Sequence, residues 1–325
     1  GNISEVDIVI DVDEGQRVTV ADIDFIGNQG VPDEDLRAAM AVKREGFWWF
    51  SSGSFNEVEY RGDLEASVPA LYRSQGYLDA RVVSDTVLID PTSGKARVEV
   101  AVEEGLQYRM NEFTVDGNEI FTDESFESLF LTPTGGILRS LGFGGTEREN
   151  EIGGMFDAEA FGSARQRAVE RYRNQGYLYI DSSPVVDRIE SPDGGGPSVN
   201  ASWQITEGPL ALINRINIAG NEYTHEWVIR NQLTVIPGDV YSQDRLLQSY
   251  QSISALGFFE VPMPFPDVEP TESGDVDITF EVVERQTGSI NFGTSVGGGV
   301  GLSGFIGYEQ PNLFGKCKRG SVQWQ

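Results

Sequence analysis

Few residues in this chain have the types and spacing that catalysis requires. His225 is the single histidine and Cys317 the single cysteine among 325 residues. Metal sites with two histidines, CxxC redox pairs and internal disulfides are therefore excluded. A Ser–His–Asp triad would have to use His225. Its surroundings, YTHEWVIRNQ, have the pattern of a first helical turn, so we expect this histidine on an exposed helical surface.

A glycine-rich segment near the C-terminal end also matches a ligand-binding motif. Gly299, Gly301 and Gly304 have the G-x-G-x-x-G spacing, but a dinucleotide site needs a strand before this motif and a helix after it. Here the alternation typical of a strand continues through the glycines. No G-x-x-x-x-G-K-[ST] sequence occurs. We expect no cofactor and no metal site, and we predict that the chain is not an enzyme.

The charge balance limits the kinds of partner. Lys and Arg total 24 against 51 for Asp and Glu, which gives a net charge of −27 at pH 7. Nucleic acids and lipid-headgroup surfaces both attract proteins that carry a positive field, so this charge strongly disfavours either as the main partner, and we expect no nucleic acid. Hydrophobic residues make up 39% and charged residues 23% of the chain, which is typical of a folded protein.

A short motif that recurs three times predicts the elements of the fold. The pattern apolar–x–apolar–x–Gly–Asn begins at Ile23, Phe113 and Ile216. It predicts a half-buried strand that ends in a turn, where glycine adopts positive φ without steric cost. The turn glycines are Gly27, Gly117 and Gly220. A helix should follow each turn, and Thr122 and Thr224 are placed as N-caps.

A second recurring motif marks the end of a longer helix. The segments LYRSQGYLDARV, RYRNQGYLYIDS and SISALGFFEVPM each carry a glycine followed by an aromatic residue. We expect these glycines in the left-handed conformation just beyond the helix. They are Gly76, Gly176 and Gly257. Two strands then follow in each copy, and in the first two copies the last strand closes with Glu-Gly.

Each copy is thus an α+β unit of the order β-α-α-β-β. We expect these units at residues 17–106, 107–209 and 210–285, with a glycine-rich insertion at 135–154 in the second. Residues 1–16 match only the closing strand of a truncated upstream unit, and 286–325 form a separate tail. With almost no linker between units, neighbouring units should hold a restricted set of angles.

The tail alternates apolar residues with glycine and small polar residues, which predicts strands. Strands with one apolar face and no core to cover are typical of membrane β-barrels, whose spanning strands must close on one another. We therefore expect the first strands of an incomplete outer-membrane barrel, although a hairpin on the last unit remains an alternative. The residues expected to face lipid are Ile290, Phe292, Leu302, Ile306, Tyr308, Val322 and Trp324.

The repeats and the tail together resemble a known family. The β-α-α-β-β units resemble POTRA domains, the polypeptide-transport-associated modules. The passage ERQTGSINFG followed by NLFGKCKRG is similar to the junction between the last POTRA domain and the barrel of BamA-type outer-membrane β-barrel assembly factors. One departure is Cys317, which stands where the family usually has glycine. The resemblance implies three-stranded mixed sheets, each with two helices.

The resemblance also implies a place and partners. The POTRA domains would lie in the periplasm of a Gram-negative bacterium, attached through the barrel to the outer membrane and its lipid. Partners would be unfolded outer-membrane proteins and accessory assembly lipoproteins. Two alternatives stay open, namely a related translocation or assembly barrel for autotransporters and a periplasmic scaffold module that docks lipoproteins.

An exposed sheet edge offers such clients a binding mode, because an extended segment can add to it as a further strand. The resemblance assigns this edge to the second strand of each unit, about residues 77–90, 177–191 and 258–270. Prolines remove backbone donors from the third edge, so we expect binding at the first two. The candidate client-strand residues are Leu78, Ala80, Val82, Val83, Tyr177, Tyr179 and Ile180.

Overall fold

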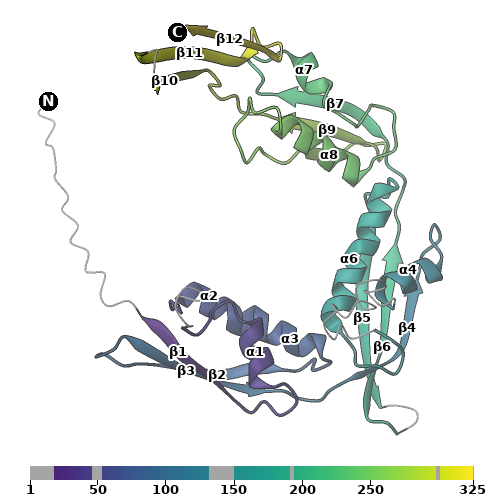
Figure 1. The fold of residues 1–325 in the computed structure, drawn as a ribbon. Coiled ribbons are helices and arrows are strands. Elements are labelled where there is room, and N and C mark those ends of the chain that lie inside the picture. Colours follow the sequence, from purple (N-terminus) through teal and green to yellow (C-terminus); the bar gives the residue numbers. More distant parts are fainter. Residues whose placement is uncertain (1–17, 46–52, 132–149, 191–193, 298–300, 325) are drawn as a thin grey trace, which may run out of the picture. The chain divides into compact units, whose positions relative to one another are not determined.

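The computed structural model describes residues 18–45, 53–131, 150–190, 194–297 and 301–324, and the side chains of 295–303 are not described (Figure 1). The upstream strand expected at 1–16 lies outside these residues, as does most of the glycine-rich insertion. The chain divides into two compact units, and the division falls within the second repeat. One unit is Gly1–Val115, Asp123–Arg165 and Pro184–Trp203, and the other is Asp116–Thr122, Gln166–Ser183 and Gln204–Gln325.

The first repeat is a three-stranded sheet covered by helices on one face (Figure 1). β3 is central, with β1 parallel on one side and β2 antiparallel on the other. The elements are β1 (Thr19–Ile26), α1 (Asp33–Ala39), α2 (Glu57–Gly62), the π-helical turn η1 (Asp63–Ser67), α3 (Val68–Ser74), β2 (Arg81–Ile89) and β3 (Lys95–Glu103).

The second and third repeats have the same sheet order, β4-β6-β5 and β7-β9-β8. The second repeat has β4 (Arg109–Asp116), α4 (Asp123–Phe130), α6 (Ala158–Asn174), β5 (Asp181–Glu190) and β6 (Pro197–Thr206). The third has β7 (Ile213–Ala219), α7 (Glu226–Arg230), α8 (Gln243–Ser254), β8 (Asp267–Pro270) and β9 (Val276–Glu281). The predicted β-α-α-β-β unit is confirmed in all three repeats.

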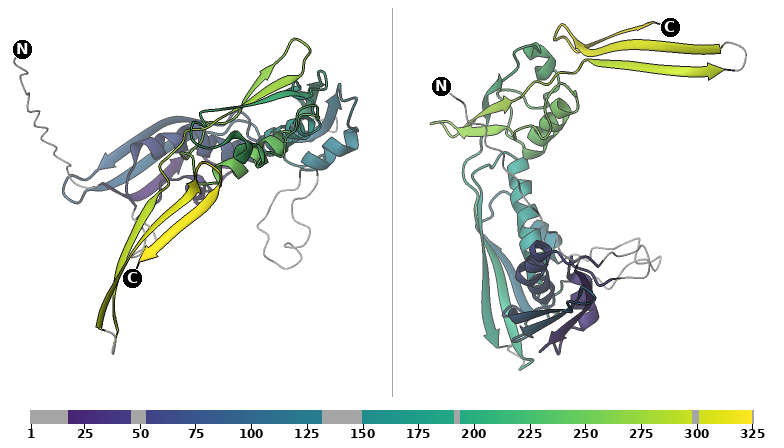
Figure 2. Two further views of the ribbon diagram at one scale, coloured as in Figure 1. Left: turned by 90° about the horizontal axis from the view of Figure 1, so that it is seen from above. Right: turned by 90° about the vertical axis from the view of Figure 1, so that its left-hand side faces the viewer.

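The tail forms a separate antiparallel sheet in the order β10-β11-β12, seen as a long ribbon in both views of Figure 2. Its strands are β10 (Ser289–Gly297), β11 (Gly301–Leu313) and β12 (Lys318–Trp324). Within the described ranges, no helix is both long enough and apolar enough to cross a membrane.

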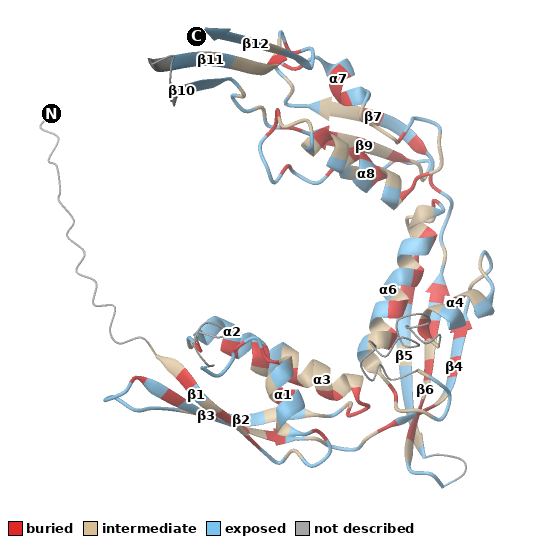
Figure 3. Cartoon of the chain, viewed as in Figure 1, coloured by how far each residue is buried: buried red, intermediate tan, exposed pale blue. Residues whose placement is uncertain are grey.

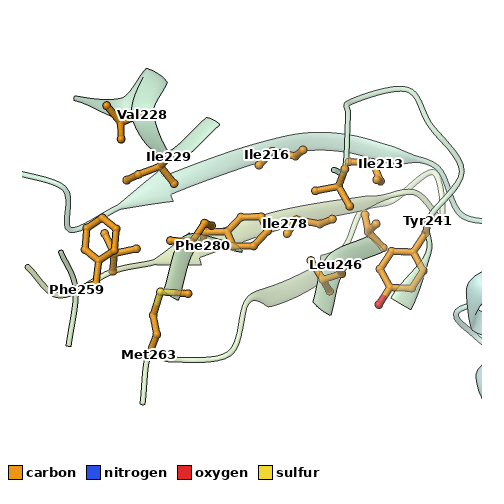
Figure 4. Packing of buried hydrophobic residues seen from close by; sticks show 14 of the residues in the cluster. Ile213, Ile216, Val228, Ile229, Tyr241, Leu246, Phe259, Met263, Ile278 and Phe280 are labelled. Atoms are coloured by element: carbon orange, nitrogen blue, oxygen red, sulfur yellow. The ribbon is translucent and has the colours of Figure 1, made fainter. Parts of the chain in front are cut away.

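Alternating burial along the central strands explains why each repeat folds. In β3 every second residue is buried, so one face meets the helices and the other faces solvent (Figure 3). In the third repeat, Ile278 and Phe280 of β9 pack beside Leu246 of α8 and Ile229 of α7 (Figure 4). The second repeat uses aromatic packing instead, with the Trp203 ring 4.9 Å from that of Phe113.

The predicted start of the second strand in the first repeat is wrong. β2 begins at Arg81 rather than Tyr77, because Tyr77 packs edge-on against Tyr72 at 5.7 Å between ring centroids. The Ala80 amide then donates to the Tyr77 carbonyl at 3.4 Å and closes a turn. Leu78 and Ala80 therefore precede the strand, and Val83 and Val82 lie within it.

The same turn recurs in the second repeat and corrects the prediction there. Tyr177 packs edge-on against Tyr172 at 6.0 Å, and the Ile180 amide donates to the Tyr177 carbonyl at 3.4 Å. β5 begins only at Asp181. The three edge residues predicted in this repeat, Tyr177, Tyr179 and Ile180, therefore lie before the strand, and Ile180 is buried.

Two predictions in the third repeat are also corrected. The strand expected over 258–270 is reduced to β8, four residues long, because Pro262, Pro264 and Pro266 supply no amide donors before it. Thr224 is not an N-cap: α7 begins after His225, which has extended backbone and makes no side-chain cap hydrogen bond. The Thr224 hydroxyl is bound elsewhere, as described below.

The turn and cap glycines adopt the conformation that their sequence context suggests. Their φ values are 93° for Gly27, 86° for Gly117, 84° for Gly220, 89° for Gly76, 93° for Gly176 and 73° for Gly257. At Gly27 a side chain is also excluded by space, since a Cβ would lie 2.2 Å from the Val102 carbonyl oxygen. This turn therefore requires glycine for two independent reasons.

Candidate functional site

Among the outer strands of the three described repeats, β2 is the longest that contains no proline. It has nine residues, contains no proline and pairs on one side only, with β3. The Asp90 amide donates to the Lys95 carbonyl at 2.9 Å, so it points toward β3. Alternate amides of a strand point in opposite directions. The amides of Asp85, Val87 and Ile89 therefore point to the open edge.

A β-bulge interrupts this edge near its start. Val82 pairs with Val102 and Ser84 with Ala101, which leaves Val83 as an extra residue in β2. Val83 is 60% exposed, whereas Val82 packs against the buried core. The regular part of the edge therefore runs from Ser84 to Ile89.

A groove of about 400 Å³ lies between this strand and the π-helical turn. Leu64, Pro69, Val82 and Val83 line it, and Arg61 and Asp85 contribute charged side chains of opposite sign. The Asp85 carboxylate accepts a hydrogen bond from the Tyr60 hydroxyl at 3.0 Å, which fixes its position. The edge thus combines free backbone donors with an apolar groove beside them.

The corresponding strands of the other repeats are less suited to accept a further strand. β5 contains Pro184 at its fourth residue, which supplies no amide donor. β8 is only four residues long and ends in Pro270. The three repeats therefore differ most at their outer strand.

A glutamate at the end of each closing strand binds the loop after the first strand of the same repeat. Its carboxylate accepts hydrogen bonds from two successive backbone amides of that loop. One amide-to-carboxylate distance for each repeat is 2.9 Å for Gly30–Glu104, 2.8 Å for Glu119–Glu207 and 2.7 Å for Tyr223–Glu284. In the first two repeats the Glu-Gly at the strand end was a sequence signal for this contact, whereas Glu284 of the third repeat precedes Arg285. The partner loops lie 61 to 88 residues away in the sequence.

The turn between β11 and β12 is bound to the third repeat. Asn312, only 3% exposed, donates through Nδ2 to the hydroxyl of Thr224, 2% exposed, at 2.9 Å. Its Oδ1 accepts the Cys317 amide at 2.8 Å, and the His225 amide donates to the Gly315 carbonyl at 2.9 Å. Moving this turn would leave buried polar groups without partners, which is unfavourable.

The same turn holds backbone conformations that are unusual for residues with side chains. Phe314 and Cys317 have φ of 58° and 54°, on either side of Gly315 at 66°. A Cβ on Gly315 would lie 2.0 Å from the Tyr223 carbonyl oxygen. Such conformations persist only where the surroundings impose them. The left-handed φ explains why glycine suits the position of Cys317, whose thiol is free and exposed here.

Glu284 lies at the centre of this contact between the β11–β12 turn and the third repeat, which we call the joint. Burial would raise the pKa of its carboxyl group, but hydrogen bonds from the Thr224 hydroxyl and from the amides of Tyr223 and Thr224 outweigh that effect. The net result is a pKa below the ordinary value, and Glu284 is ionised at neutral pH. Asn312, Thr224 and Glu284 thus form one hydrogen-bonded chain from the tail sheet into the third repeat.

The apolar residues predicted on one face of the tail lie in rows across it. Ile290 pairs with Tyr308 and Tyr308 with Val322, while Phe292 pairs with Ile306 and Ile306 with Trp324. These six side chains are all exposed, Phe292 by 84%. The seventh, Leu302, pairs with Val296, and its side chain lies outside the described part. One apolar residue was missed: Phe305, whose ring covers Gly293 on the opposite face.

The described residues contain no cluster of three or more His, Cys, Asp or Glu side chains that could hold a metal ion. His225 is exposed at the start of α7, and Cys317 is exposed in the turn after β11. The free edge of β2, the contact around Asn312 and the apolar rows of the tail are three candidate binding features of the described chain.

A family model described as "POTRA: Surface antigen variable number repeat" matches residues 18–105 and 211–285, half of the chain. The outer membrane protein assembly factor BamA of Neisseria meningitidis is 27% identical over 98% of this chain. A putative outer membrane protein assembly factor of Treponema pallidum is 27% identical over 96% of it. The chain spans only 38% and 35% of the lengths of these two relatives.

Among solved structures, the chain is similar to the crystal structure of BamA POTRA3-5 from Haemophilus influenzae. The TM-score is 0.61, with 18% sequence identity over 83% of this chain and 98% of that one. At this identity the similarity concerns the fold. It agrees with the three β-α-α-β-β repeats described above.

Proposed function

The chain belongs to the POTRA family, and on this premise we propose that it is the periplasmic part of an outer membrane protein assembly factor. It binds unfolded β-barrel proteins and supports their insertion into the outer membrane, by binding rather than by catalysis. The free edge of β2 carries this proposal. Its outward amides donate hydrogen bonds to the carbonyl groups of an incoming strand. That strand becomes the fourth of the sheet, in the order β1-β3-β2-client.

The physical character of such binding suits a transient receptor. Main-chain pairing ignores side-chain identity, so one edge serves many different clients. Each added hydrogen bond contributes only about 0.5–1.5 kcal/mol net, and the regular edge from Ser84 to Ile89 offers few of them. Binding is therefore weak and reversible, and the client can be passed on.

The tail and the partners complete the proposal. β10, β11 and β12 are the first strands of the membrane-embedded barrel, with the rows that contain Ile290 and Phe292 facing lipid. Accessory lipoproteins of the assembly machinery dock on the repeats. The names of the two relatives, both outer membrane protein assembly factors, support a place at the outer membrane, and the exposure of the apolar rows supports their contact with lipid.

The experiment is a titration of the isotope-labelled chain with an eight-residue peptide from a barrel strand, followed by NMR. Val87→Pro removes one outward donor, and Val87→Ala controls for the loss of side-chain packing. We expect Val87→Pro to weaken binding by about fivefold or more, and Val87→Ala by less than about twofold.

Unchanged amide shifts of β3 in the peptide-free Val87→Pro protein will establish that the sheet is intact. Peptide-induced shifts should then map to β2 and its neighbour β3. Shifts confined to the helices, or equal affinities of the two variants, would show that recognition uses a side-chain groove and not the strand edge.

A further inference from the structure

A pocket of about 550 Å³ lies where the third repeat meets the tail sheet. This volume falls within the range of small-molecule sites. Its walls come from residues 284–288 after β9, from Tyr223 and Thr224 before α7, from Phe258 beyond α8, and from the facing ends of β10 and β11. None of the assignments above gives this pocket a role.

One wall of the pocket is apolar and continues the exposed face of the tail. Ile290 and Tyr308 line the pocket, and they are directly paired across β10 and β11. Tyr308 pairs in turn with Val322 of β12, so this row of apolar side chains begins in the pocket and leads out of it. A ligand that fills the pocket and extends from it would follow the apolar face.

The other wall carries one anionic and one cationic side chain in sequence. Arg285 donates through Nε to the Gly257 carbonyl at 3.0 Å, which orients its guanidinium group. Within the described ranges its two terminal amino groups have no hydrogen-bond partner. Glu284 lines the same pocket and is ionised at neutral pH, because its hydrogen bonds hold its pKa below the ordinary value.

A third group of residues closes the polar side. Gln310 donates through Nε2 to the Thr287 hydroxyl at 3.1 Å and accepts the Tyr308 hydroxyl at 3.2 Å. All three residues line the pocket. The pocket therefore has an apolar side, a neutral polar side and a pair of opposite charges.

We infer that this pocket binds one phospholipid with a zwitterionic headgroup that carries a phosphate and an ammonium. The Arg285 fork of donors matches the phosphate oxygens, and the Glu284 carboxylate matches the ammonium. The acyl chains lie along Ile290 and Tyr308. The net charge of −27 disfavours a purely anionic headgroup, whereas a headgroup without net charge meets no such repulsion.

This inference rests on the proposed function only in placing the tail sheet at a bilayer. The two can fail separately, because peptide binding is measured on β2 and lipid binding on the pocket. The probe is dihexanoylphosphatidylethanolamine below its micelle concentration, titrated into the labelled chain and followed by NMR. We expect saturable shifts at the amides of Arg285, Thr287 and Ile290.

Arg285→Gln should weaken this binding at least fivefold, whereas Arg215→Gln, at an exposed arginine of β7 that pairs with Asp277 outside the pocket, should leave it unchanged. Because Arg285 also holds the Gly257 carbonyl, Ile290→Ser serves as a second variant outside that contact. It should weaken lipid binding at least threefold and leave the binding of O-phosphoethanolamine, the headgroup without chains, unchanged.

Three further ligands separate the possible sources of the signal. Inorganic phosphate and O-phosphoethanolamine should each bind more weakly than the lipid, and the short-chain phosphatidylglycerol, which lacks the ammonium, should also bind more weakly. Equal or tighter binding of any of the three would overturn the assignment. Lipid-induced shifts confined to residues outside the pocket, or no loss in both variants, would overturn it as well.

Discussion

The first and third repeats have the same central strand, turn glycine and glutamate contact, but they differ in their exposed outer strand and loop. Both have a central closing strand, a turn glycine of positive φ, and a glutamate that binds the loop after the first strand. Yet β2 has nine residues and an open edge, whereas β8 has four and ends in proline. The loop held by Glu104 donates to that carboxylate through the amides of Gly30 and Val31, whereas the loop held by Glu284 also binds Asn312 of the tail. The shared internal elements therefore specify the fold, whereas the outer strand and the loop distinguish one repeat from the other.

Substitutions of the shared turn glycines should lower the free energy of unfolding more than substitutions at the joint. A Cβ on Gly220, whose φ is 84°, would lie 1.9 Å from the Val282 carbonyl oxygen. Gly238 has a similar φ of 90°, but a Cβ there would meet nothing within 4 Å. We expect Gly220→Ala to lower the free energy of unfolding of the third repeat by about 3 kcal/mol or more, and Gly238→Ala by about 1 kcal/mol.

Hydrogen exchange of the β9 amides measures this loss without interference from the other repeats. Gly27→Ala should produce a comparable loss at β3, since the same kind of backbone clash occurs at 2.2 Å. Equal effects of Gly220→Ala and Gly238→Ala would mean that backbone strain alone governs this position and that the close approach of strands is unimportant.

The joint to the tail comes next in expected size. Asn312→Ala removes two hydrogen bonds and leaves the buried Thr224 hydroxyl without its donor. We expect a local loss of about 1–3 kcal/mol, read as faster hydrogen exchange at the amides of Thr224 and Cys317. Gln310→Ala removes a partly exposed hydrogen bond to Thr287 and should cost less than about 1 kcal/mol.

The amides of β2 provide the internal control for both variants, because the first repeat has no such joint. Unaltered exchange at Thr224 in Asn312→Ala would show that the turn is held by its backbone contacts with Tyr223 and His225. In that case the comparison between the two loops would lose its energetic basis.

The residues predicted correctly from the sequence are those whose conformation is determined by their neighbours in the sequence. The turn glycines were identified because an apolar pair followed by Gly-Asn already specifies a strand that ends in a positive φ. The start of β2 was missed because it depends on Tyr77 packing against Tyr72, which competes with the strand pattern. Thr224 was misassigned as a cap because its real partner, Asn312, lies 88 residues further along the chain. No local pattern shows such a partner.

The smallest predicted effect is a pH dependence confined to the third repeat. The folded-state pKa of Glu284 lies below its ordinary value of 4.5. A depressed pKa contributes stability that is fully present above the unfolded-state pKa and is lost as the pH falls through the folded-state pKa. We expect the stability of the third repeat to decrease as the pH is lowered below about 4.5.

Glu284→Gln should remove this part of the pH dependence and leave the rest of the profile parallel to that of the native chain. The measurement is the unfolding midpoint of the third repeat between pH 6 and pH 3. Identical slopes for the two proteins over this window would show that Glu284 does not contribute to the acid sensitivity.

The bulge at Val83 gives the β2 edge a fixed length. An added strand needs a regular ladder, and the regular part of β2 holds six residues, which span about 20 Å. On the N-terminal side of Ser84, the extra residue Val83 shifts the alternation of outward and inward backbone groups by one. A partner strand that extends past this point therefore loses its register. The edge therefore limits how many peptide residues can pair with it. Affinity should rise with peptide length up to about six residues and then level off. A series of peptides of increasing length, titrated by the same NMR method, would reveal a continued rise if the bulge did not set this limit.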